Sequence, residues 1–245
     1  MFHRPPEYVS TGAVDGSHIA FGVEGRGLFV GRFSGPERHV AGAASESVLT
    51  WAPAGDLLDA DRSGHIVARS AAGALLARWR AWTATIAVDR SGGVVYLTHS
   101  GELIRTDGER RVTLVDAGRL VPDPRVVDAL ADGSIAVLGP RRLAIFSAAG
   151  RLTASAGTPS GRTTVQGVSA APDGRGYAYV RTVRHARGGV DRIELLVPGD
   201  RAPRTLVTIL VSLQGCGWGS DVRWDGSRLR YRNADGRRRN VDTGI

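Results

Sequence analysis

Short apolar stretches, separated by turns that contain glycine, recur along the whole chain. Six segments share one order, in which an apolar stretch is followed by a tight turn and then by a second apolar stretch. Residues 14–21, 90–96 and 131–137 are clear examples. No segment shows a convincing apolar period of 3.6 residues, so the pattern predicts strands rather than helices.

The glycines of these turns recur at intervals close to forty residues. Asp-Gly between two apolar runs favours a tight hairpin turn, because both residues tolerate the positive φ that such a turn requires. A regular spacing of this length indicates one structural unit repeated along the chain. The glycines are Gly16, Gly55, Gly92, Gly133, Gly174 and Gly226, at intervals of 39, 37, 41, 41 and 52 residues.

Each unit continues in the same way after its first hairpin. In the second unit a turn at Ser63-Gly64 precedes an apolar stretch at 66–70, and a turn at Ala72-Gly73 precedes another at 74–79. Four short antiparallel strands in about forty residues are typical of a propeller blade. An irregular β-sandwich is the alternative, and six similarly spaced units argue against it.

We therefore predict an all-β fold, a single β-propeller of about six four-stranded blades, with five to seven possible. The predicted domain covers residues 1–245. Its blades lie approximately at 9–42, 47–79, 84–116, 125–156, 167–210, and 217–245 together with 1–8. In this arrangement the N-terminal segment 2–8 would supply the outer strand of the sixth blade, whose own unit has only three strands.

The fifth unit carries a family resemblance. Residues 171–180 read Ala-Pro-Asp-Gly-Arg-Gly-Tyr-Ala-Tyr-Val, which resembles the Pro-Asp-Gly repeat of TolB-type propellers, also called WD40-like PD40 repeats. The other five units match its Asp-Gly and apolar core but mostly lack the proline. The Gly-His and Trp-Asp signatures of true WD40 blades do not recur with the repeat, since Gly64-His65 and Trp224-Asp225 occur once each and in different units. Nothing here encodes the separate N-terminal α/β domain of TolB. The resemblance implies a propeller fold and a tendency to bind a partner.

The two ends of such a blade differ. If its strands are named a to d in chain order, the a–b and c–d turns lie at one end, which we call the turn end. The b–c loops and the connections between blades lie at the other, the loop end. The long segments 79–84, 116–125, 156–166, 182–190 and 211–219 fall at the loop end. Binding residues concentrate on loops held by a rigid scaffold, so we predict the loop end as the binding face. Neutral variation in loop length is the alternative.

Several side chains at the loop end are suited to binding. Trp79-Arg80-Ala81-Trp82 combines aromatic and arginine side chains, which make good anchors in protein interfaces. Alternatively, at least one of these tryptophans fills the space between blades. The candidate binding residues are Trp79, Arg80, Trp82, Arg119, Asp123, Arg125, Arg162, Arg184, His185, Arg187 and Trp218.

Catalytic and metal chemistry finds weaker support. Three histidines near the loop end could converge, as could four aspartates that would then bind a divalent ion, as in lactonase-type propellers. The glycine-rich segment 215–219 resembles a phosphate loop, but no helix follows it. We therefore expect no catalytic residue, no metal and no cofactor. The groups concerned are His65, His99 and His185, and Asp59, Asp61, Asp123 and Asp128.

The charge is strongly positive. The formal net charge is +8, the isoelectric point is about 10.8, and all 32 basic residues are arginines. This indicates either an anionic partner or simply the codon usage of a GC-rich genome. In the sixth unit Arg228, Arg230 and Arg232 alternate along one strand, with Arg223 and the arginines at 237–239 close by.

The cellular compartment stays open. The first eight residues have no apolar region typical of a signal peptide, and no apolar run approaches the roughly 18 residues that span a bilayer. Cys216 is the single cysteine, so no internal disulfide is possible. We expect a cytoplasmic protein, or an exported one whose signal has been removed.

Three functions follow as hypotheses. The leading one is a non-enzymatic binding or scaffold propeller that presents the loop end to a protein or other ligand. The second is a propeller enzyme, a hydrolase or lactonase-like, with a site at the mouth of the channel. The third is a binder of nucleic acid or another anionic polymer or surface through the arginines of the sixth blade.

Overall fold

The chain forms six consecutive antiparallel sheets in a computed structural model. The structure describes residues 9–15, 18–23, 26–32, 35–41, 48–52, 54–61, 64–81, 83–157, 163–185, 188–211 and 222–245. Among them the one helical element is a short 3-10 turn, η1 (Ala117–Arg119). No helix in this part of the chain is long and apolar enough to cross a membrane. The residues group into two compact units, 1–113 and 114–245.

The first unit holds two complete sheets and most of a third. The first sheet is β1 (Val9–Asp15), β2 (His18–Val23), β3 (Gly27–Arg32) and β4 (Arg38–Ala41). The second is β5 (Val48–Trp51), β6 (Leu57–Asp61), β7 (His65–Arg69) and β8 (Leu75–Arg80). The third is β9 (Thr83–Val88), β10 (Val94–Thr98), β11 (Glu102–Thr106) and β12 (Arg111–Asp116), whose last strand runs into the second unit.

The second unit holds the other three sheets. The fourth is β13 (Val126–Ala129), β14 (Ile135–Leu138), β15 (Arg142–Phe146) and β16 (Leu152–Gly157). The fifth is β17 (Thr163–Ala170), β18 (Tyr177–His185), β19 (Gly188–Leu196) and β20 (Arg204–Val211). The sixth has three described strands, β21 (Arg223–Asp225), β22 (Arg228–Arg232) and β23 (Arg238–Asp242). The prediction of an all-β fold built from consecutive antiparallel sheets is therefore confirmed.

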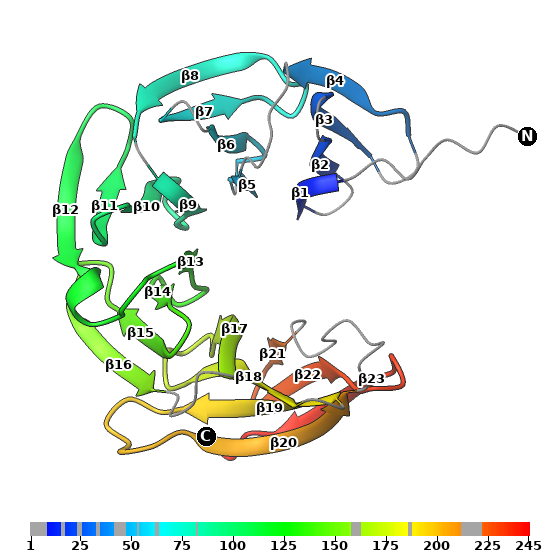
Figure 1. The fold of residues 1–245 in the computed structure, drawn as a ribbon, viewed down its shortest axis with the longest axis vertical. Helices are drawn as coiled ribbons and strands as arrows, with labels where there is room; N and C mark the ends of the chain where they lie inside the picture. Colours follow the sequence, from blue (N-terminus) through cyan, green and yellow to red (C-terminus); the bar gives the residue numbers. More distant parts are fainter. Residues whose placement is uncertain are drawn as a thin grey trace, which may run out of the picture. The chain divides into compact units, whose positions relative to one another are not determined.

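Every sheet is a meander in which each strand pairs with the next one along the chain (Figure 1). The first hairpin of the third sheet shows why the turns close at glycine. Gly92 has φ +84°, and its N–H donates to the carbonyl of Asp89 at 3.0 Å. Gly133 takes the same place in the fourth sheet, with φ +85°. These backbone conformations are costly for residues with a Cβ, which explains the recurring glycine.

The cores lie between consecutive sheets. In the first unit, Leu28 and Val30 of the first sheet pack with Leu49 and Leu57 of the second. A second layer joins the second and third sheets and includes the fully buried Tyr96. In the second unit, apolar layers join the fourth sheet to the fifth and the fifth to the sixth. Within each unit, consecutive sheets therefore bury apolar side chains against one another.

The insertion in the fifth repeat unit of the sequence differs from the prediction. Residues 182–190 were expected to form a loop, but β18 continues to His185 and β19 begins at Gly188. Val183 pairs with Val190, and His185 with Gly188. The extra residues therefore lengthen a hairpin, because its paired backbone groups satisfy one another's hydrogen bonds. The predicted loop at 79–84 is also wrong, since β8 ends at Arg80 and β9 begins at Thr83.

Among the described residues the last sheet has three strands, as expected from the sixth repeat unit. Residues 1–8, which were predicted to add an outer strand to this sheet, lie outside the described residues. The closure prediction therefore stays a prediction.

Candidate functional site

The connection between the third and fourth sheets, residues 117–125, lies at the predicted loop end, and the structure describes all of its residues. Its backbone is held against the fourth sheet. Ala117 and Val121 are fully buried, and the N–H of Arg125 donates to the carbonyl of Leu138 at 2.8 Å. A Cβ at Gly139 would lie 2.7 Å from the carbonyl oxygen of Pro122, so the loop after β14 and this connection touch closely. The connection is thus a fixed platform.

Three predicted binding residues project from this platform. Arg119 and Asp116 form an ion pair at 2.8 Å, and 85% of the Arg119 side chain is exposed. Asp123 accepts hydrogen bonds from Nε and Nη2 of Arg125 at 2.9 and 2.6 Å. Asp123 also has a left-handed backbone, with φ +51°, which aspartate tolerates better than most residues. The structure therefore brings Arg119, Asp123 and Arg125 together on one anchored segment.

The residues of the tryptophan-arginine stretch 79–82 lie in different environments. Trp79, near the end of β8, packs against the apolar layer between the second and third sheets, and its indole N–H is buried without a partner in the described structure. This is the alternative in which a tryptophan fills the space between blades. Arg80, the next residue, is exposed. Trp82 lies outside the described residues.

The remaining predicted residues are only partly visible. Arg184 is exposed near the end of β18, on a strand rather than in the expected loop. His185 ends that strand, and its side chain is not described. Arg162, Arg187 and Trp218 lie outside the described residues, as do Cys216 and the glycine-rich segment 215–219.

The histidines and aspartates that we considered as alternative metal ligands do not come together in the described part of the chain. No three His, Cys, Asp or Glu side chains there form a group able to hold a metal ion. Asp59 is buried on β6 rather than solvated in a loop. Asp61 ends the same strand, and Asp128 lies on β13. Nδ1 of His65 is 3.2 Å from a guanidinium nitrogen of Arg78, and His99 is exposed.

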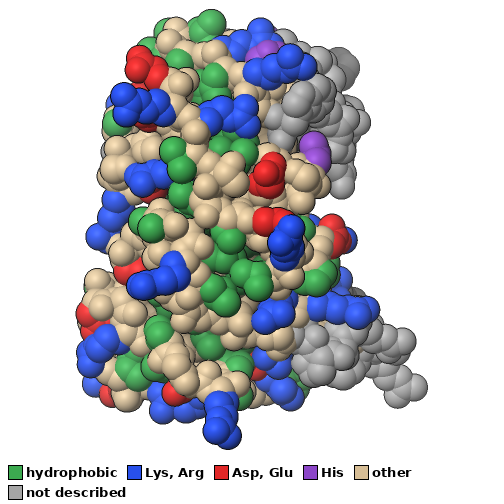
Figure 2. Space-filling view, turned by 90° about the vertical axis from the view of Figure 1, so that its left-hand side faces the viewer, with side chains coloured by type: hydrophobic (Ala, Val, Ile, Leu, Met, Phe, Trp, Pro, Cys, Tyr) green, Lys and Arg blue, Asp and Glu red, His purple; other side chains and the backbone are tan. Residues whose placement is uncertain are grey.

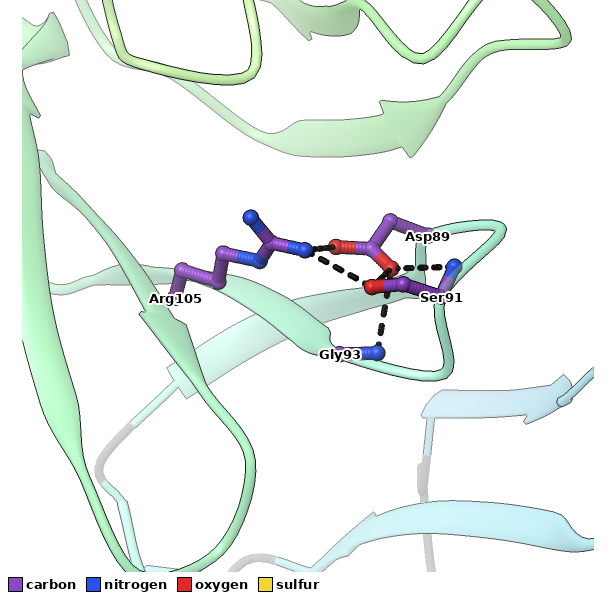
Figure 3. Close-up of polar contacts among 4 residues, drawn as sticks. All are labelled: Asp89, Ser91, Gly93 and Arg105. Carbon is purple, nitrogen blue, oxygen red and sulfur yellow. Dashed lines mark hydrogen bonds and ion pairs between the residues drawn. The ribbon is translucent and has the colours of Figure 1, made fainter.

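An aspartate, a serine and an arginine meet at the turn end of the third sheet (Figure 3). Asp89 accepts hydrogen bonds from the backbone N–H of Ser91 at 2.8 Å, its hydroxyl at 2.6 Å, and the N–H of Gly93 at 3.0 Å. Arg105 forms an ion pair with Asp89 at 2.5 Å and donates to the Ser91 hydroxyl at 2.8 Å. This arrangement closes the hairpin, since the carboxylate holds the N–H groups of its own turn.

The same contacts set the protonation of Asp89. Partial burial raises the pKa of its carboxyl, but the hydrogen bonds from Ser91 and Gly93, together with Arg105, outweigh that effect. The pKa therefore lies below its ordinary value. In the fourth sheet Asp132 likewise accepts from the N–H and the hydroxyl of Ser134.

The fifth sheet encloses a polar group that sequence reasoning missed. Glu194 is 2% exposed, and its carboxylate accepts a hydrogen bond from the Tyr179 hydroxyl at 2.6 Å and pairs with Arg181 at 2.8 Å. Tyr179 and Glu194 lie directly opposite each other on β18 and β19. Burial and the neighbouring carboxylate raise the pKa of the Tyr179 hydroxyl, which therefore stays protonated and donates. The group belongs to the interior of the blade.

A hollow of about 400 Å³ opens at the turn end of the first unit, between the first and second sheets. Arg32 and Arg38 line it together with His18, whose ring lies 5.9 Å from that of Trp51. The opposite wall is the Ala71-Ala72 turn. Sequence reasoning did not select this place, because the short turns there carry no motif.

Charge elsewhere on the surface is mixed. On the face drawn in Figure 2, arginine side chains are spread among carboxylates and apolar groups. Exposed apolar side chains include Leu75, Leu76, Val112 and Leu152, all on the fourth strands of their sheets. Scattered exposed apolar residues are normal for a folded protein.

Comparison with known proteins shows the fold. The sequence matches no protein-family model and no curated protein. Among solved structures the chain is similar to the propeller of Dos1, with a TM-score of 0.59 and 11% identity over 99% of this chain and 71% of that one. It is similar to the propeller domain of Cps50 (Swd1) from Myceliophteria thermophila, with a TM-score of 0.61 and 11% identity over 95% and 82%. A third similar structure, YCF48 bound to D1 peptide, has a TM-score of 0.58 and 7% identity over 100% and 78%.

These likenesses define the class to which the protein belongs. The chain is a β-propeller, and its six described sheets are similar to those of the Dos1 and Cps50 (Swd1) propellers. At such low identities the similarity establishes the fold and no more.

Proposed function

We propose that this protein is a non-enzymatic binding propeller, a scaffold that presents the loop end of its blades to a protein partner. The observation that carries the proposal is the anchored connection 117–125, which holds the exposed charged side chains of Arg119, Asp123 and Arg125 on a buried base. Side chains fixed in this way lose little freedom on binding, which favours affinity.

The neighbours in structure support the same class of function. One of them, YCF48, was solved with a peptide bound. The resemblance of residues 171–180 to the TolB-type PD40 repeat adds a second propeller family with a tendency to bind partners. Arg80 and Arg184 extend the proposed surface within their own units, and Trp82, Arg162, His185, Arg187 and Trp218 remain candidate members of it.

Paired substitutions test the proposal. The immobilised wild-type chain is used to capture partners, and Arg119→Ala/Arg125→Ala is compared with Arg151→Ala/Arg201→Ala. The second pair removes the same charge from exposed positions at the turn end of the fourth and fifth sheets.

We expect the first pair to release the partners that the wild-type chain retains, and the second pair to keep them. Retention by the first pair together with release by the second would place the binding surface at the opposite end and refute the proposal.

A further inference from the structure

The hollow between the first two sheets combines apolar walls with two arginines. Its volume of about 400 Å³ lies within the range of pockets that bind small molecules. All of its described lining belongs to the first unit, and that lining contains no carboxylate. Val30, Pro36, Ala71 and Ala72 supply apolar surface, and Arg32 and Arg38 supply the positive charge.

The strand register places both arginines on the face of the first sheet that turns toward the second. Arg38 on β4 lies directly opposite Val30, and Arg32 is two residues from Val30 on β3. Opposed residues of antiparallel strands point to the same side, as do residues two apart on one strand. Val30 packs with Leu57 of the second sheet in the apolar layer between the two sheets. The arginines therefore lie at the end of that layer.

Both walls of the hollow are held by close contacts. A Cβ at Gly31 would lie 3.1 Å from the carbonyl oxygen of Pro36, so the turn after β3 packs tightly on that strand. On the opposite wall a Cβ at Gly73 would overlap Val40, and β8 begins beside the end of β4 (Figure 1). The N–H of Gly73 also donates to the carbonyl of Ser70 at 2.7 Å. The hollow is therefore preformed, which lowers the cost of binding a ligand.

Neither arginine is neutralised by a described neighbour. Arg32 and Arg38 are exposed, and no ion pair or hydrogen bond joins their side chains to another residue in the described part of the chain. The acidic residue in the same row of strand pairs is Asp15, which lies opposite His18, itself opposite Arg32. Two strand spacings, about 10 Å, therefore separate the backbones of Asp15 and Arg32. Glu37 is exposed and is not part of the lining.

Two buried donors lie at the same end of the interface. Trp51 and Arg69 are both directly opposite Leu57, so they share the face that turns toward the first sheet. The indole N–H of Trp51 and Nε of Arg69 are buried without a hydrogen-bond partner in the described structure. Because buried polar groups are normally paired, this end of the interface has more donors than acceptors. A ligand that brings acceptor oxygens suits such a place.

The arginines of the last sheet are less available. Arg230 forms an ion pair with Asp225 at 2.6 Å, and Arg223 and Arg232 interact with other residues as well. Their charge is therefore partly neutralised within the molecule. The hollow in that sheet, of about 330 Å³, is lined by Arg223, Arg230, Tyr231, Arg232 and Arg238.

We propose that the hollow between the first two sheets binds a small organic monocarboxylate with an apolar body. A guanidinium group donates in a planar fork that matches the two oxygens of a carboxylate. Two such groups next to apolar walls suit a ligand that is charged at one end and apolar at the other. Inorganic phosphate and acidic peptides bring charge without the apolar part. The inference goes beyond the proposed function and does not rest on it, because the hollow lies at the turn end.

Ligand-detected NMR tests the proposal directly. The probe is 2-naphthoate. Its amide, 2-naphthamide, has the same shape without the charge, and acetate has the charge without the apolar body. For a ligand of this size the usual efficiency per atom gives a Kd of about 1 mM. At about pH 7.5 and about 150 mM salt we expect 2-naphthoate to bind with about that Kd, and the amide and acetate to bind at least about tenfold more weakly. Inorganic phosphate and a tetraglutamate peptide are titrated as competing anions.

A matched pair of double variants separates the hollow from general charge. Arg32→Gln/Arg38→Gln removes both charges of the lining. Arg90→Gln/Arg110→Gln removes the same charge from exposed positions of the first unit outside the lining. The first variant should bind 2-naphthoate at least about tenfold more weakly, since one charge-assisted hydrogen bond is worth roughly that factor. The control should stay within about twofold of the wild type. All four arginines are exposed, so both variants should keep a Tm within about 2 °C of the wild type.

A second pair of variants changes the opposite wall. Ala72→Glu places a carboxylate at an exposed position of the lining, where it competes with the ligand for the arginines, and Ala72→Gln adds the same bulk without the charge. We expect Ala72→Glu to bind 2-naphthoate at least about fivefold more weakly than Ala72→Gln does.

Four results would overturn the proposal. The first is no binding of 2-naphthoate at about 10 mM, and the second is equal binding of its amide. The third is an equal loss of binding in the two double variants or in the two Ala72 variants. The fourth is tighter binding of inorganic phosphate or tetraglutamate than of 2-naphthoate, because the ligand would then be a different anion.

Discussion

The buried carboxylate of Glu194 provides a quantitative prediction about the second unit. The substitution Glu194→Gln keeps the size of the side chain and removes its charge. Arg181, whose side chain is only 13% exposed, would then lose its ion-pair partner, and the Tyr179 hydroxyl would donate to a weaker acceptor. Breaking a buried pair from one side costs about 3–5 kcal/mol.

That cost converts into a measurable change in melting temperature. For a chain of 245 residues, 1 kcal/mol moves the Tm by about 2–4 °C. We therefore expect the Tm of Glu194→Gln, followed by circular dichroism, to fall by about 6–20 °C. The control Glu109→Gln removes an exposed carboxylate and should change the Tm by about 2 °C or less, because surface charges contribute little.

A double-mutant cycle isolates the pair. Arg181→Met removes the cation, and Glu194→Gln/Arg181→Met removes both charges. The double variant should lose less stability than the sum of the two single variants, since neither group is then left buried and unpaired. A Tm for Glu194→Gln within about 2 °C of the wild type, or additive losses in the cycle, would refute the reasoning.

Two further predictions concern turns. Gly150 and Gly108 both have positive φ in the turn before the fourth strand, but a Cβ at Gly150 would lie 2.5 Å from the carbonyl oxygen of Leu114 and one at Gly108 would touch nothing. Gly150→Ala should therefore lower the Tm by several degrees more than Gly108→Ala does, and equal losses would contradict the contact. Asp89→Asn should destabilise the chain at pH 7, because the lowered pKa of Asp89 means that its carboxylate stabilises the fold above about pH 3.8. This contribution is lost as the pH falls through the folded-state pKa of Asp89. Urea titrations should therefore show that the difference in unfolding free energy between Asp89→Asn and the wild type shrinks below pH 3.8. A difference that stays constant with pH would count against this prediction.

Strands and turns could be predicted because their signals are local. A glycine between two apolar stretches reports the positive φ of its own turn, as the φ of +85° at Gly133 shows. The repeat then sets the number of sheets. The long hairpin of the fifth repeat unit was missed because Gly188 and Gly189 suggest a loop. In the structure these two glycines belong to β19 and pair with β18.

The polar sites could not be predicted with the same accuracy. Glu194 lies fifteen residues from Tyr179 in the chain, and only the register of two strands brings them together. The arginines of the last sheet were visible as an alternating pattern, but their gathering around one hollow depends on the opposed strands. The platform at 117–125 depends on its contact with Gly139, a residue that carries no functional motif.

The most direct test of the binding function is a hydrogen-exchange map of the chain with and without a partner that the wild type retains. The proposed function predicts slower exchange over residues 117–125 in the complex. It predicts unchanged exchange in the turns at 147–151 and 197–203, at the other end of the fourth and fifth sheets. Slower exchange confined to those turns, with 117–125 unaffected, would contradict the proposal that the loop end is the binding surface.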